Sequence, residues 1–218
     1  MIPLRDVIPS RTIPYLTVTI IILNALAWFY ELGLPREDLP VFLQQFGVVP
    51  AYFAPPTLIS SMFLHGSWSH VLGNMWYLWI FGDNVEDRMG HFRFLIFYLL
   101  CGIVAAFGQI FIDPTSTLPT IGASGAIAGV MGAYFVLYPQ SRVLTLIPLI
   151  VFWEIVELPA IFLLGFWFLM QLFSAGAIAA TANSHSGGVA FMAHVAGFVT
   201  GLVGVFIFRK RVPDTRWV

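Results

Sequence analysis

Few polar side chains lie inside the apolar stretches of this sequence, where a polar group is costly and is a candidate for function. They are His70, Asn74, Ser124, Gln171 and His194. A serine hydroxyl becomes an effective nucleophile when a neighbouring base takes its proton, and histidine has a suitable pKa for that task. The pair therefore predicts nucleophilic catalysis by Ser124, with His194 as general base. Gln171 has no assigned role at this stage.

Residues that could stabilise a developing negative charge accompany this pair. Ser124 lies near the start of the apolar run 120–134, and the N-terminus of a helix offers unpaired N–H groups and a favourable dipole. His70 and Asn74 are spaced i, i+4 and share one helix face, so both can donate hydrogen bonds toward an oxyanion. An ordinary interior histidine and an interhelical hydrogen bond from Asn74 remain the simpler alternatives.

The composition places these residues in a membrane protein. Of 218 residues, 59% are hydrophobic and 10% are charged, and the mean hydropathy is +0.87. Soluble domains carry about 25% charged residues, so a water-soluble helical domain is excluded and an all-α polytopic membrane protein is predicted. The net charge of −1 gives no reason to expect nucleic acid, and the single cysteine, Cys101, excludes an intrachain disulfide.

We predict one compact domain over residues 1–218 with six transmembrane helices in contact with the lipid bilayer. The spans cover approximately residues 14–30, 63–81, 92–112, 122–137, 158–179 and 189–208. A signal peptide is the competing interpretation of the first span, but no clear cleavage site follows it. The connecting segments are predicted as an interfacial loop at 31–56, a polar turn at 82–90 and a surface-lying or hairpin-like connector at 143–157.

The basic residues predict the orientation. Six spans with a cytoplasmic N-terminus place nine of them on the cytoplasmic side (Arg5, Arg11, Arg88, Arg93, Arg142, Arg209, Lys210, Arg211 and Arg216) and only Arg36 outside. Both termini are then cytoplasmic, and the second, fourth and sixth spans run inward from the outer face. At about 1.5 Å per residue, the four candidate side chains lie within roughly 10 Å of depth below that face.

Glycines on the fourth and sixth predicted spans recur at helical spacing. The fourth span contains Gly125, Gly129 and Gly132, with Gly122 just before them, and the sixth contains Gly197, Gly201 and Gly204. Small residues at such spacing let helix backbones approach closely. If the two faces meet, they bring Ser124 and His194 within hydrogen-bonding reach. A simple packing role of these glycines is the alternative for either helix taken by itself.

Other catalytic classes have weak support. The chain lacks a His-Glu-x-x-His motif, which argues against a zinc protease. His65 and His70 are five residues apart and share a helix face poorly, so a two-histidine metal site is weak. Asp83 and Asp113 fall in predicted loops, which argues against a membrane aspartyl protease. We therefore expect no metal and no cofactor.

Three motifs, in this order and at one predicted depth, resemble those of the rhomboid intramembrane serine proteases. They are His65-x4-His70-x3-Asn74, Gly122-Ala123-Ser124-Gly125 and Ala193-His194-Val195-Ala196-Gly197, and the segment Glu86-Asp87-Arg88-Met89-Gly90 is similar to the one that follows the second span in that family. The resemblance implies a Ser124–His194 dyad without an acidic third member. His70, Asn74 and the backbone N–H of Ser124 would stabilise the oxyanion.

The resemblance also implies the substrates: transmembrane proteins, cut in or near the membrane after a small residue. It implies that the 31–56 loop is embedded in the outer leaflet and that the fifth span moves to admit substrate. Two features depart from some family members. Ala128 stands where those members have a tyrosine that stacks on the catalytic histidine, so other packing must hold the ring of His194, and the loop lacks a Trp-Arg pair.

Two functions of other classes are weighed against the protease. One is a catalytically silent relative that binds transmembrane segments, and the other is a small transporter, for which no internal repeat is visible. The short chain, without an added domain or transit peptide, predicts a prokaryotic plasma membrane with the active site opening to the outer side. The sequence does not predict the oligomeric state or the physiological substrate.

Overall fold

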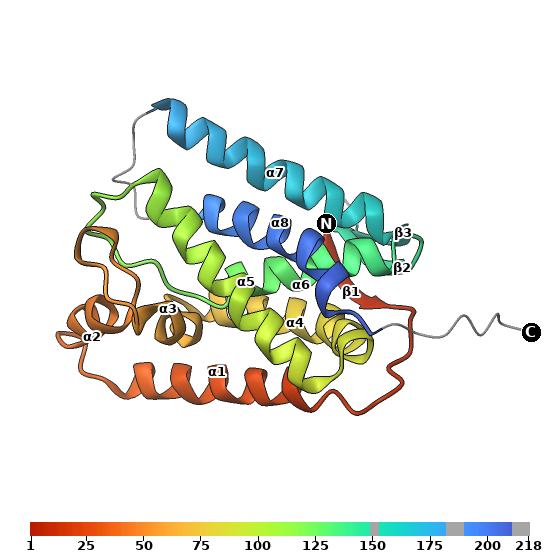
Figure 1. Ribbon diagram of the computed structural model, residues 1–218, viewed down its shortest axis with the longest axis horizontal. Coiled ribbons are helices and arrows are strands. Elements are labelled where there is room, and N and C mark those ends of the chain that lie inside the picture. The colour runs from red at the N-terminus through yellow and green to blue at the C-terminus, as the bar shows by residue number, and fades with distance from the viewer. Residues whose placement is uncertain (149–152, 182–189, 211–218) are drawn as a thin grey trace, which may run out of the picture.

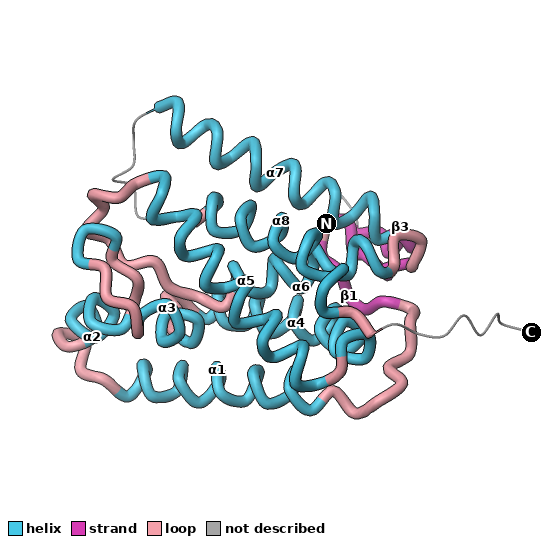
Figure 2. Tube along the Cα trace, in the orientation of Figure 1, coloured by secondary structure: helices cyan, strands magenta, loops and turns pink. Residues whose placement is uncertain are grey.

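The computed structural model describes residues 1–148, 153–181 and 190–210. In chain order the elements are β1 (Ile2–Asp6), α1 (Tyr15–Gly33), α2 (Leu39–Phe46), η1 (Pro50–Tyr52), α3 (Thr57–Ser60), η2 (Ser61–Phe63), α4 (Trp68–Met89), α5 (His91–Ile112), α6 (Ser124–Leu137), β2 (Arg142–Pro148), β3 (Trp153–Pro159), α7 (Ala160–Thr181) and α8 (Phe191–Phe208). Helices dominate, and the strands gather at one end of the molecule (Figure 2).

The bundle is organised around α6. Every residue from Gly125 to Tyr134 is buried, and α8, α5 and α4 all pack against this helix. The outer layers are α1 on one side and α7 on the other (Figure 1). Because the buried stretch of α6 is rich in glycine and alanine, its neighbours can approach its backbone from several sides.

Four helices are long and apolar enough to cross a membrane: Tyr15–Gly33, His91–Ile112, the Ala160–Ala177 part of α7, and Phe191–Phe208. The chain is therefore an integral, multi-pass membrane protein. The 14 residues of α6 extend about 21 Å at ~1.5 Å per residue, which is less than the roughly 30 Å of a bilayer core. The helix α4 is not among the four, so the count of six spans stays a prediction.

The polar turn predicted at residues 82–90 is wrong, because α4 continues as a helix to Met89. Its acidic side chains are satisfied by the start of α1. Glu86 is fully buried and accepts hydrogen bonds from the backbone N–H groups of Leu16 and Thr17 at 3.0 and 2.8 Å. Helix N-termini favour negative charge, so tertiary pairing keeps these carboxylates in a helix. The turn itself comes at Gly90, where φ is 79°.

The N-terminal segment, expected only to be a polar start, contains a strand. In the three-stranded sheet β1–β2–β3, β1 pairs with residues about 140 positions away, such as Ile2 with Leu146. The β2–β3 pair is antiparallel, in agreement with a hairpin-like connector. Tyr134 donates a hydrogen bond to Asp6 at 2.6 Å, and burial raises the pKa of the Asp6 carboxyl to about 6. This contact ties the sheet to α6.

The segment after α1 supports the chain that enters α6. Residues 47–50 are buried, and Val48 exchanges two backbone hydrogen bonds with Thr120, of 3.0 and 2.8 Å. The N–H of Gly122 donates to the carbonyl of Ser61 at 2.8 Å. Non-helical backbone is tolerated at membrane depth only where its polar groups find partners within the protein. These bonds therefore allow α6 to begin below the rim of the bundle.

The glycines of α6 and α8 lie at the contact between these two helices. A Cβ atom built on Gly197 would lie 2.0 Å from the carbonyl oxygen of Gly125, and one on Gly201 would lie 1.9 Å from that of Gly129. The predicted grouping of Gly122 with them is wrong. Gly122 precedes α6, has φ of 119°, and would place a Cβ 2.6 Å from His70 Nε2. Glycine is required there by the backbone conformation and by that close approach.

Candidate active site

The structure places Ser124 and His194 in direct contact. Ser124 Oγ lies 2.8 Å from His194 Nε2, although the two residues are 70 positions apart in the sequence. His194 is 9% exposed, in the second turn of α8, and the glycine contacts between α6 and α8 bring its ring to the serine. This geometry allows the hydroxyl to donate its proton toward the imidazole.

Ser124 is the first residue of α6, so its backbone N–H belongs to the first turn, where no intrahelical acceptor exists. The preceding residue, Ala123, makes no side-chain capping hydrogen bond. The partial positive charge of the helix N-terminus is thus presented beside the hydroxyl. A carbonyl oxygen polarised during attack by Ser124 would develop its negative charge next to these groups.

His70 and Asn74 approach the same place from α4. A Cβ on Gly122 would lie 2.6 Å from His70 Nε2 and 3.7 Å from Asn74 Nδ2, so both nitrogens face the backbone just before the serine. The N–H of Gly66 donates to His70 Nδ1 at 3.4 Å. A neutral imidazole that accepts at Nδ1 carries its proton on Nε2. His70 is therefore in the tautomer that can donate a hydrogen bond into the site.

Asn74 is oriented by His65, a residue without an assigned role in the sequence-based prediction. Asn74 Nδ2 lies 3.0 Å from His65 Nε2, while His65 Nδ1 lies 3.3 Å from the carbonyl of Phe63. Because a carbonyl only accepts, Nδ1 carries the proton and Nε2 accepts from the amide. The amide group has a second N–H, which stays available for the site. The first histidine of the motif thus supports the third residue.

The ring of His194 has two partners on α7 that the sequence-based prediction missed. Gln171 Oε1 lies 2.8 Å from His194 Nδ1, and the rings of Trp167 and His194 lie 5.7 Å apart at an interplanar angle of 38°. Ala128 offers no ring, so these contacts hold the imidazole instead. Their i, i+4 spacing and the isolation of Gln171 in an apolar helix were the available signals.

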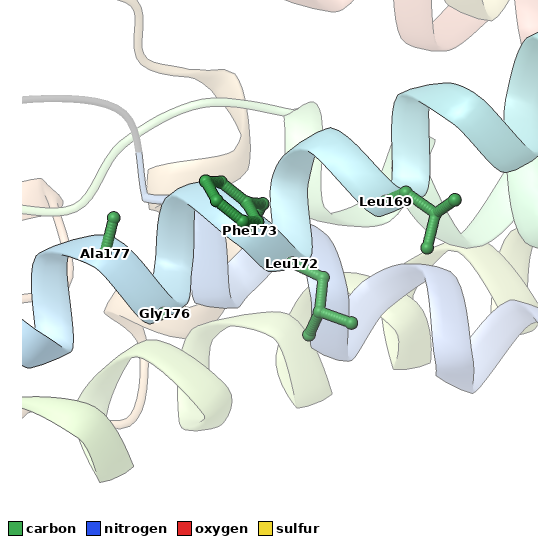
Figure 3. A pocket seen from close by; sticks show the side chains of 5 residues that line it. All are labelled: Leu169, Leu172, Phe173, Gly176 and Ala177. Carbon is green, nitrogen blue, oxygen red and sulfur yellow. The ribbon is translucent and has the colours of Figure 1, made fainter.

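A small cavity adjoins the serine. It has a volume of about 30 Å³, and Ser124 and Gly122 are among its lining residues, with alanines of three segments. A second hollow, of about 440 Å³, lies along α7 and is lined by Leu169, Leu172, Phe173, Gly176 and Ala177. Figure 3 shows that all five belong to this one helix. These apolar side chains supply no reactive group, so only the small cavity belongs to the candidate site.

No group of three or more His, Cys, Asp or Glu side chains is arranged to hold a metal ion within residues 1–148, 153–181 and 190–210. The chemistry available at Ser124 is therefore argued from the side chains and backbone described above. Taken together, these observations define a multi-pass membrane protein with a serine and a histidine in contact at its centre.

Comparison with known proteins gives the family. The model of the Rhomboid domain matches residues 55–211, and the chain belongs to the rhomboid family. The matched region includes α4, α6 and α8, the helices that carry the three sequence motifs.

Relatives of this chain carry rhomboid names. Rhomboid-like protein 11, chloroplastic, of Arabidopsis thaliana is 28% identical over 198 residues, which cover 86% of this chain and 66% of that protein. Presenilin-associated rhomboid-like protein A, mitochondrial, of Danio rerio is 34% identical over 98 residues (44% and 26%). Rhomboid protein 1, mitochondrial, of Saccharomyces cerevisiae is 30% identical over 92 residues (40% and 27%). The matches thus span less than two thirds of each relative.

Proposed function

We propose that this protein is an intramembrane serine endopeptidase that cleaves transmembrane proteins in or near their membrane segments. The observation that carries the proposal is the 2.8 Å contact between Ser124 Oγ and His194 Nε2. Membership of the rhomboid family agrees with it. The outward-facing site, the cytoplasmic termini and a prokaryotic plasma membrane remain part of the proposal.

In the proposed mechanism, Ser124 Oγ attacks the substrate carbonyl carbon while its proton passes to His194 Nε2. The oxyanion is stabilised by the backbone N–H of Ser124 and by the donors of His70 and Asn74. The imidazolium then gives the proton to the leaving amine, and the peptide bond breaks to leave an acyl-enzyme. Water attacks the acyl group, gives one proton to His194 and releases the carboxylic acid, and His194 returns that proton to Ser124.

Labelling with a fluorophosphonate tests the proposal. Wild-type protein, Ser124→Ala and His194→Ala are purified in detergent and incubated with the probe, and Thr200→Val is the control on α8, where Thr200 bonds only its own helix at Ala196. We expect labelling of wild type and Thr200→Val only. A folded wild-type protein that does not label would contradict the protease assignment and favour a relative that binds transmembrane segments without cutting them.

Loss of an oxyanion donor should slow turnover. We expect His70→Ala and Asn74→Ala each to reduce kcat by about 10²–10³-fold, or roughly 2.7–4 kcal/mol, because a donor that acts on the transition state is removed. Initial rates on a single-span substrate in liposomes measure this. Ser69→Ala, at an exposed position of the same first turn, is the control. Unchanged kcat in a stable Asn74→Ala protein would remove Asn74 from the proposed site.

The small cavity predicts a size limit for the substrate. A cavity of about 30 Å³ beside Ser124 admits a methyl group but not a benzyl group without rearrangement. Replacing alanine by phenylalanine before the scissile bond should therefore lower kcat/KM by at least about 100-fold, at the upper end of what one pocket achieves by size. Mass spectrometry of the products shows whether the cleavage site is kept. Equal rates for both substrates would show that this cavity does not receive the side chain.

A further inference from the structure

The second ring nitrogen of His194 has a partner on a third helix. His194 Nδ1 lies 2.8 Å from Gln171 Oε1 of α7, while Nε2 lies 2.8 Å from Ser124 Oγ of α6. The ring is 9% exposed, so few water molecules can replace either partner. The three side chains form one hydrogen-bonded chain through the imidazole.

We propose that Gln171 is a positioning residue, which holds His194 in the tautomer that can take the proton of Ser124. This inference rests on the proposed function and adds a third member, from α7, to the dyad. A neutral imidazole has one N–H and one acceptor nitrogen. The opposite tautomer would present an N–H to Ser124 and could not act as its base.

The amide oxygen selects between the two tautomers. An oxygen of this kind accepts and does not donate, so the Nδ1 facing it carries the proton and Nε2 keeps its lone pair toward Ser124. When Nε2 takes the serine proton, the imidazolium still donates Nδ1–H to Gln171 Oε1, and that bond becomes charge-assisted. Gln171 neither gains nor loses a proton at any step. Its effect is exerted through His194.

The same stretch of α7 fixes the plane of the ring. Trp167 precedes Gln171 by one turn, and its ring centre lies 5.7 Å from that of His194. Two neighbouring side chains of one helix thus set the orientation and the tautomer of the base. This differs from a packing role alone, in which the amide would only fill space between α7 and α8.

Kinetics as a function of pH distinguish the two roles. We measure kcat and KM between pH 5 and 9 for wild type, Gln171→Met, Gln171→Leu and Gln171→Glu on one single-span substrate. Methionine keeps the length of the side chain and removes the amide acceptor, and leucine is the second apolar variant should methionine fold poorly. Phe173→Leu, at a position 78% exposed on the same helix, is the control for damage to α7.

We expect Gln171→Met to lower kcat by about 10- to 100-fold, because a buried N–H loses its acceptor, with little change in KM. Gln171→Glu should restore kcat, since a carboxylate also accepts from Nδ1. A negative charge beside an imidazolium favours the charged form. The acidic limb of the kcat profile should therefore move to higher pH in Gln171→Glu and to lower pH in Gln171→Met. His70, the titratable residue that faces His194, is unchanged in all variants.

Two results would overturn the inference: wild-type kcat in Gln171→Met, or an acidic limb at one pH in all folded variants. Either would leave the proposed function intact, provided that wild type still cleaves its substrate and labels with the fluorophosphonate. Absence of labelling in wild type would instead reject the proposed function itself. The thermal unfolding midpoint of each variant identifies a loss that comes from misfolding.

Discussion

Turnover of a single-span membrane substrate should fall by about 10⁶-fold when His194 is replaced by alanine, and by a similar factor for Ser124→Ala. The reason is that the two side chains act as one unit through their 2.8 Å contact. Without the imidazole, the hydroxyl keeps its proton and is a weak nucleophile. Without the hydroxyl, no acyl-enzyme forms.

The double variant sharpens this prediction. If Ser124 and His194 work only together, Ser124→Ala/His194→Ala should be no slower than either single variant, because catalytic residues of one unit are strongly non-additive. Product formation in liposomes, measured over days with Thr200→Val as control, gives the required sensitivity. A residual activity of a tenth in folded Ser124→Ala would show that another group carries the reaction.

Substitution of Gly201 by alanine should have the second largest effect, on the stability of the fold. The added Cβ would lie 1.9 Å from the carbonyl oxygen of Gly129, and both partners belong to helix backbone, which cannot yield as the end of a side chain can. We expect a loss of about 3 kcal/mol or more. The unfolding midpoint in detergent should drop, and activity should drop because α8 carries His194.

Gly73→Ala is the matched control. A Cβ at Gly73, inside α4, meets nothing within 4 Å, and alanine favours a helix over glycine by about 0.5–1 kcal/mol. Its midpoint should stay the same or rise slightly. If Gly201→Ala unfolded at the temperature of wild type, the close approach of α6 and α8 would not be a source of stability.

Local sequence carried much of this protein. The apolar runs predicted the long helices, since a chain this rich in apolar side chains must bury them in lipid or in other helices. The isolation of polar residues in those runs led to His70, Asn74, Ser124 and His194. Glycine spacing predicted a close helix pair. Each of these inferences depends on residues a few positions apart.

Contacts between distant segments decided the rest. The acidic stretch at 82–90 reads locally as a turn, and it is helical because Glu86 is paired with the start of α1. The strand β1 depends on a partner near Leu146, which no local pattern announces.

At the site, the sequence determined which residue types could react, and the tertiary structure decided what surrounds them. Gln171 in the sequence is one polar residue in an apolar helix, but in the fold it lies 2.8 Å from His194. Gly122, which seemed to continue a helical glycine series, instead has φ of 119° and adjoins His70. The physical reason is that composition and spacing record what a side chain can do. Its partners depend on which helices pack together, and that depends on the whole chain.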